Sequence, residues 1–164
     1  MRSMLSGLAL AAVVLYAKAA GASDALPHSL LIWDNAARTS LPLWLALWLL
    51  LVVLSFLSSL FFVRRHWAAR IAIGGFALSH VLVVLIELGG VATLRTGLVS
   101  VTHVIGWAPV WIVLARELPA AKRDSRYGTW CRVLLAVISV CLIFDFRDAG
   151  MYVYYQLAGH PALA

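Results

Sequence analysis

Charged residues are scarce in this chain of 164 residues: Asp, Glu, Lys and Arg make up only 12% of it, whereas 63% is hydrophobic. Soluble domains carry a charge on about a quarter of their residues. A chain this apolar must keep most of its side chains in lipid or against one another. The composition therefore argues against a separate water-soluble domain and predicts one membrane domain.

Cysteine is also rare, with only Cys131 and Cys141, both in the last apolar stretch. They form no C-x-x-C motif, and no second pair exists that would complete a zinc site or a disulfide framework. We interpret both thiols as small buried hydrophobic groups.

Motifs of known chemistry are absent as well. The sequence has no H-E-x-x-H or E-x-x-H, and no Ser or Cys stands at a recognisable spacing from a histidine and an acid. An enzymatic role is therefore not predicted. The net charge of +6 does not indicate nucleic acid, because the 13 Lys and Arg residues fall mostly in two short segments between apolar runs.

Long apolar runs are what the chain does have. They predict membrane spans at about 41–63, 70–88, 98–115 and 129–149, each near the roughly 20 residues that cross a bilayer. Lipid offers no hydrogen-bond partner to backbone N–H and C=O groups, so a membrane span must be a helix or part of a closed barrel. The strands of a barrel would alternate between apolar and polar residues, so these unbroken apolar runs are expected to be helices. The predicted fold is an all-α integral membrane protein, a four-helix bundle in one domain of residues 23–164. Residues 1–22, with Arg2, a short apolar run and Ala-Gly-Ala, indicate a signal peptide or a fifth N-terminal helix.

Basic residues are distributed unevenly between the connecting segments. The 64–70 and 116–132 segments contain Arg64, Arg65, Arg70, Arg116, Lys122, Arg123, Arg126 and Arg132, whereas the other side has Lys18, Arg38, Arg95 and Arg147. Cytoplasmic loops are enriched in Lys and Arg. We therefore expect a multi-pass protein of the bacterial inner membrane with a periplasmic C-terminus.

Five ionisable residues lie within or beside the apolar spans: His80, Glu87, His103, Asp145 and Asp148. Such residues are costly in hydrocarbon and mark functional sites by default. The expected topology puts four of them in the outer half of the membrane, with His80 about one helical turn deeper. Asp145 and Asp148 share one face of the last span and are expected to face the bundle. Their candidate partners are His103 by depth, Arg95 by its position in the loop and Arg147 as a local alternative.

Three site chemistries are open for these groups. His80 and His103 could be axial ligands of haem b. Glu87, His103, Asp145 and Asp148 could bind a divalent metal such as zinc, iron or manganese. Protons or cations could move along Glu87, His103 and Asp145 in an oligomer.

The interpretation we favour from sequence is that these groups satisfy one another and hold the helices in register. The protein would then be an accessory, assembly or scaffold subunit of a membrane complex. Its expected partners are the lipid bilayer and another membrane protein or further copies of itself. Gly75 and Ser79 form a small-x-x-x-small pair, which predicts that another helix packs closely there.

Overall fold

Helices make up the described part of the chain. The computed structural model describes residues 43–89, 95–121 and 125–158, without the side chains at positions 87, 95, 96 and 155. In order, the elements are α3 (Leu43–Leu57), the short 3-10 helix η1 (Ser58–Phe61), α4 (Trp67–Leu88), α5 (Arg95–Glu117) and α6 (Arg126–Leu157). Four helices are long and apolar enough to cross a membrane, which confirms the predicted all-α bundle. The predicted signal peptide or fifth helix at 1–22 lies outside the described residues.

The last helix extends beyond its predicted bounds at both ends. It begins at Arg126 rather than near 129, because the Ser125 side chain caps it by accepting a hydrogen bond from the Gly128 N–H at 2.9 Å. It ends at Leu157 rather than near 149, and its 32 residues measure about 48 Å. This length exceeds the roughly 30 Å of a bilayer core, so α6 must tilt or project from it.

A tight turn joins α3 to α4. The Arg70 side chain folds back on this turn and donates hydrogen bonds to the carbonyl oxygens of Val63 at 2.9 Å and Arg64 at 3.2 Å. These bonds satisfy carbonyl groups that a helix end leaves without partners. Arg70 therefore has a structural role besides its contribution to the charge bias.

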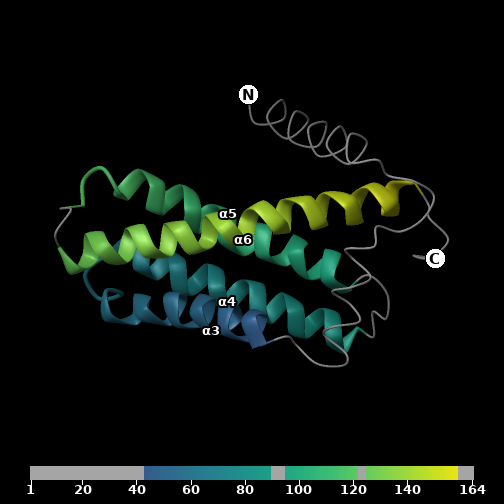
Figure 1. Ribbon diagram of the computed structural model, residues 1–164, viewed down its shortest axis with the longest axis horizontal. Helices are drawn as coiled ribbons and strands as arrows, with labels where there is room; N and C mark the ends of the chain where they lie inside the picture. Colours follow the sequence, from purple (N-terminus) through teal and green to yellow (C-terminus); the bar gives the residue numbers. More distant parts are fainter. Residues whose placement is uncertain (1–42, 90–94, 122–124, 159–164) are drawn as a thin grey trace.

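The centre of the bundle is α5, which packs along both α4 and α6, whereas α3 makes fewer contacts (Figure 1). Phe56 on α3 is the largest fully buried side chain among the described residues, and it packs into this core. Cys131 is buried and Cys141 is half-buried, and both are free thiols. Most of the other fully buried large side chains come from α5 and α6: Val110, Leu114, Leu134 and Ile138.

The α4–α5 crossing is set by two glycines. A Cβ atom built on Gly106 would lie 2.5 Å from the carbonyl oxygen of Gly75, and one built on Gly75 would overlap the Gly106 carbonyl and the Val110 side chain. Only glycine allows this backbone approach. The predicted close packing at Gly75 and Ser79 is confirmed, and the partner helix is α5.

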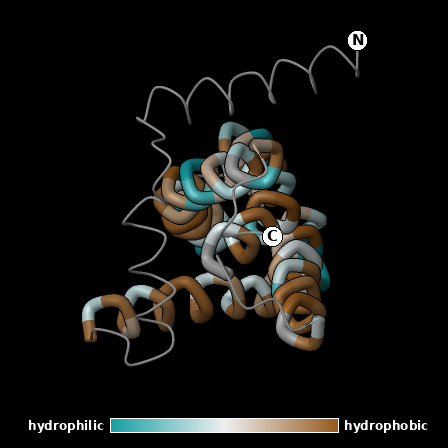
Figure 2. The backbone as a smooth tube through the Cα atoms, turned by 90° about the vertical axis from the view of Figure 1, so that its right-hand side faces the viewer, coloured by the Kyte–Doolittle hydropathy of each residue, from teal (hydrophilic) through white to brown (hydrophobic). Residues whose placement is uncertain are grey.

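The outer surface of the bundle is apolar. Figure 2 shows that hydrophobic residues (brown) predominate along the helices, with only short hydrophilic stretches (teal). Large hydrophobic side chains are exposed on every helix, among them Leu43, Leu88, Ile112 and Ile143. A soluble monomer rarely exposes so much apolar surface, whereas lipid accepts it.

Candidate functional site

A histidine and an aspartate from different helices meet in the bundle. The Nδ1 atom of His103 on α5 lies 3.2 Å from Oδ1 of Asp145 on α6. The two side chains are only 22% and 12% exposed. The predicted contact between His103 and Asp145 is therefore present, and it joins α5 to α6.

Trp107 continues this contact toward α4. Its indole stacks on the His103 ring, with centroids 4.0 Å apart and planes 9° from parallel. Its Nε1–H donates to the Ser79 hydroxyl at 2.9 Å, and that hydroxyl donates to the Phe76 carbonyl oxygen, also at 2.9 Å. Polar contacts and stacking thus run from α6 across α5 to α4. The hydrogen bond between Trp107 and Ser79 was not predicted from the sequence.

Asp148 is the more deeply buried of the two carboxylates, with 6% of its surface exposed. Its Oδ1 atom lies 3.6 Å from Nε of Arg147, which is beyond hydrogen-bond length. That oxygen and Oδ2 of Asp145 are both buried without a hydrogen-bond partner. Both carboxylates therefore face protein, as predicted, but neither is fully satisfied by the described side chains.

His80 lies on the exposed side of α4. Its Nδ1 atom is 2.8 Å from the carbonyl oxygen of Phe76, one turn earlier in the same helix, and its ring packs on that of Phe76 with centroids 4.1 Å apart. Phe76 in turn stacks on Phe56 of α3. His80 is therefore directed away from the α5–α6 contact that holds His103.

The relative depth of the two histidines differs from the prediction. Gly106 contacts both Gly75 and Ser79, so it is level with a point between them on the antiparallel helix α4. His103 precedes Gly106 by three residues on α5, and the same distance along the antiparallel helix α4 leads to position 80, because both helices rise equally per residue. His103 and His80 are therefore level with each other. The expectation that His80 lies one turn deeper is wrong. That expectation was based on assumed ends of the two spans, whereas the contact between Gly75 and Gly106 determines how α4 and α5 are aligned along their axes.

The described side chains do not assemble the predicted metal site. Among the residues that the structure describes, no group of three or more His, Cys, Asp or Glu side chains is placed to hold a metal ion. His103 and Asp145 come together, with Asp148 one turn farther along α6, while the side chain of Glu87 lies outside the description. The full ligand set therefore stays a prediction.

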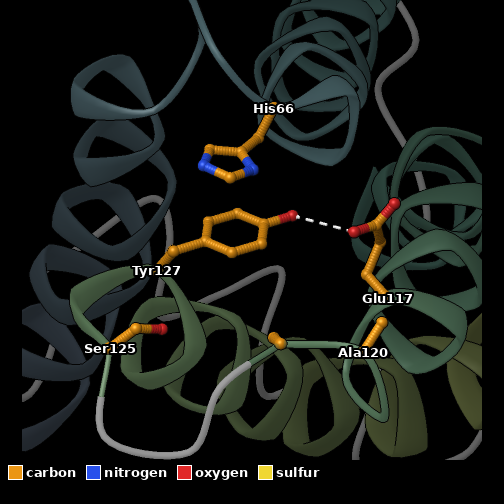
Figure 3. A pocket seen from close by; sticks show the side chains of 6 residues that line it. His66, Glu117, Ala120, Ser125 and Tyr127 are labelled. Atoms are coloured by element: carbon orange, nitrogen blue, oxygen red, sulfur yellow. Dashed lines mark hydrogen bonds between the residues drawn. The ribbon is translucent and has the colours of Figure 1, made fainter.

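A pocket of about 410 Å³ lies beside the α3–α4 and α5–α6 connections, and Figure 3 shows the side chains that line it. The His66 ring stacks on Tyr127, with centroids 3.5 Å apart and planes 12° from parallel. The Tyr127 hydroxyl donates to Oε2 of Glu117 at 3.3 Å. The remaining lining residues are Ala120, Ala121 and Ser125.

Sequence reasoning missed this pocket and the aromatic cluster beneath it. The Tyr127 ring also lies 5.7 Å from Phe62 and 5.4 Å from Trp130, measured between centroids. His66 and Tyr127 each follow a basic segment that was interpreted only as a topology signal. The signal that could have found the cluster is that four rings flank the two connections at one end of the bundle.

Comparison with protein-family models, with curated proteins and with solved structures found no match to this chain.

Proposed function

We propose that this chain is an accessory, assembly or scaffold subunit of a membrane complex, and that it binds its partner through the outer face of α4. The observation that carries this proposal is the position of His80. An imidazole in the membrane needs a polar partner, because lipid offers none. His80 is exposed on the bundle, and α4 continues for about 12 Å beyond it. Its side chain is too short to reach the headgroups over that distance.

The hydrogen bond to Phe76 determines what the partner must offer. A carbonyl oxygen only accepts, so at 2.8 Å the His80 Nδ1 atom must carry the proton. The other ring nitrogen of the neutral imidazole, Nε2, is then an acceptor. The partner is expected to present an N–H or O–H donor at this depth.

The surroundings of His80 suit a docked helix. The α4 stripe, defined as Gly74, Ala77, His80, Val81 and Val84, is exposed along one side of the helix. A Cβ atom on Gly74 would meet nothing within 4 Å, so there is open space at this point. Small residues allow helices to approach closely in membranes. The other stripe residues have no side-chain donor, so symmetric pairing of two α4 stripes does not supply what Nε2 lacks.

The charge distribution supports a location in an inner membrane. Arg64, Arg65, Arg116 and Arg126 lie at the end where the α3–α4 and α5–α6 connections meet (Figure 1). Under the positive-inside rule this end is cytoplasmic, and the C-terminus lies on the periplasmic side.

Photocrosslinking in native membranes tests the partner surface. A benzoylphenylalanine at Val81, which is 55% exposed, should give a discrete protein adduct, and one at Phe144 on α6, which is 58% exposed, serves as the control for a lipid-facing position. The Val81 adduct should persist in His80→Gln, which keeps an acceptor, and be lost in His80→Leu. If Val81 and Phe144 give the same products, or if His80→Leu has no effect, the proposal fails.

A second candidate function is haem or metal binding, and the way that both imidazoles are held favours it. In His80 and in His103, an oxygen atom lies within 3.2 Å of Nδ1, so Nε2 remains for a ligand. Metal-binding histidines are usually oriented in this manner. Purified protein would then show a Soret band or stoichiometric metal, and His103→Ala would remove it. A colourless, metal-free preparation would contradict this candidate.

A further inference from the structure

The pocket beside the α3–α4 and α5–α6 connections lies where the membrane spans end. His66, which lines it, directly precedes the span that begins at Trp67. Glu117 is the last residue of the α5 span, and Ser125 directly precedes the α6 span. The cavity is therefore at the depth of the lipid headgroups. Its volume of about 410 Å³ is within the range of small-molecule sites and far exceeds the roughly 30 Å³ that one water occupies.

Glu117 is the one acidic side chain among the residues that line this pocket. It is half-buried, and its Oε2 atom accepts the hydrogen bond from the Tyr127 hydroxyl. Figure 3 shows its second carboxylate oxygen directed away from Tyr127. Among the described residues, no ion pair involves Glu117. The carboxylate therefore retains acceptor sites for a positively charged ligand.

Aromatic stacking fixes the position of this carboxylate. Tyr127 stacks on both His66 and Trp130, with centroids 3.5 Å and 5.4 Å away. A ring packed on two others cannot rotate freely, so its hydroxyl group stays at Oε2 of Glu117 and orients the carboxylate. Ala120 and Ala121 line the same cavity, and their small side chains leave room for a ligand. Positions 122–124, which connect Ala121 to Ser125, lie outside the described part of the chain.

Arginines stand beside the acidic group. Arg65, Arg116 and Arg126 are exposed, and each is next in sequence to a residue that lines the pocket. Their positive charges disfavour a simple cation near Glu117, but they favour a ligand that also carries a phosphate group. A small polar group with both an ammonium and a phosphate, held at headgroup depth, has the chemistry of an aminophospholipid headgroup.

We propose that this pocket binds the phosphoethanolamine headgroup of a membrane lipid, with the primary ammonium group on Glu117 and the phosphate group toward the arginines. The site is separate from the α4 stripe and does not depend on the proposed partner. A primary ammonium group donates up to three hydrogen bonds, whereas the quaternary group of phosphatidylcholine has no N–H to donate. Phosphatidylglycerol has the phosphate group but no ammonium group. The pocket should therefore prefer phosphatidylethanolamine to both.

Native mass spectrometry of the full chain, released from nanodiscs with equal amounts of these three lipids, tests the preference. The wild type should retain one phosphatidylethanolamine per chain, at least about tenfold more often than either other lipid, since the hydrogen-bonded charge pair forms only with this headgroup. Glu117→Gln should abolish the preference without lowering retention of phosphatidylglycerol, because an amide has no charge to attract an ammonium group. Phe144→Leu is the control, since Phe144 is 58% exposed on the apolar surface of α6 and lines no part of the pocket.

Soluble phosphoethanolamine distinguishes a lipid from a water-soluble ligand. It should compete only at a much higher concentration than the lipid, whose acyl chains hold its headgroup beside the site. Competition at an equal concentration would overturn the assignment to a lipid.

Equal retention of the three lipids by the wild type overturns the proposal whether or not any variant folds. Ala120→Phe, which fills the cavity and keeps the carboxylate, provides a second variant and should also remove the preference. A preference that persists in either Glu117→Gln or Ala120→Phe, with helical content confirmed by circular dichroism, overturns the proposal as well.

Discussion

The carbonyl oxygen of Gly75 lies only 2.5 Å from where a Cβ atom on Gly106 would be, so the backbones of α4 and α5 touch at their crossing. This contact sets the register that brings Ser79 to Trp107 and makes His80 level with His103. A change of one methyl group at the crossing should therefore affect both the stability of the bundle and the polar contacts around it.

We expect Gly75→Ala to destabilise the bundle by about 1–3 kcal/mol, because the added methyl group overlaps the Gly106 carbonyl and Val110 and forces the helices apart. Reversible unfolding in mixed micelles measures the free energy. Gly74→Ala is the matched control, since a Cβ atom there meets nothing within 4 Å. Equal stability of the two variants would contradict the proposed role of the crossing.

The Trp107–Ser79 hydrogen bond should show an energetic coupling. A double-mutant cycle with Trp107→Phe and Ser79→Ala is expected to give at least about 0.6 kcal/mol, the average measured for such bonds within membranes, and no more than the maximum of about 1.7 kcal/mol. The comparable bond from Trp111 to Ser139, 2.8 Å long, lies on the exposed surface of the bundle, where its two side chains are less constrained than at the buried crossing, so its coupling should be smaller. A larger coupling for Trp111 and Ser139 would contradict this assignment.

Much of the fold could be predicted because a segment that crosses lipid must be apolar and about as long as the membrane is thick. Unbroken apolar runs predict helices, and the Gly75–Ser79 spacing predicted a close crossing before its partner was known. His103 was one of three candidate partners of Asp145, and it was named because the two residues lie at a similar depth in their predicted spans. Local rules and the thickness of the membrane were sufficient for these features.

Features that depend on register between helices could not be predicted. The depth of His80 relative to His103 requires knowing that Gly106 meets Gly75 and Ser79, and no pattern within one helix contains that information. The stacking of His66 on Tyr127 joins residues far apart in sequence at the ends of two spans. At the ends of spans, aromatic and basic residues occur in the same sequence pattern whether their side chains face the lipid headgroups or one another, so the sequence does not distinguish the two arrangements.

Reporter fusions should place both the α3–α4 turn and the α5–α6 connection in the cytoplasm. Arg64, Arg65, Arg116 and Arg126 are retained there because of their charge. Alkaline phosphatase should be active when fused after the last residue, Ala164, and inactive when fused at Ala120, with a fluorescent protein giving the opposite pattern. Fluorescence from the C-terminal fusion would contradict this topology. It would mean that the C-terminus is cytoplasmic and that Asp145 and Asp148 lie in the inner half of the membrane.

The last prediction separates the structural role of Asp145 from its charge. Asp145→Asn should leave the protein folded, because the amide still forms a hydrogen bond with His103 across the 3.2 Å contact. Asp145→Leu should cost about 1–3 kcal/mol, because it leaves the His103 Nδ1 group without its partner in the bundle. Unfolding in mixed micelles measures both effects.

Phe146→Leu is the control for a change of side chain on α6, since Phe146 is 48% exposed and its replacement should shift stability by less than about 0.5 kcal/mol. If Asp145→Leu is as stable as Phe146→Leu, the His103–Asp145 contact does not hold the helices together. If Asp145→Asn is instead as unstable as Asp145→Leu, the bundle needs the carboxylate charge and not only a hydrogen bond, which would mean that His103 is paired with Asp145 as an imidazolium.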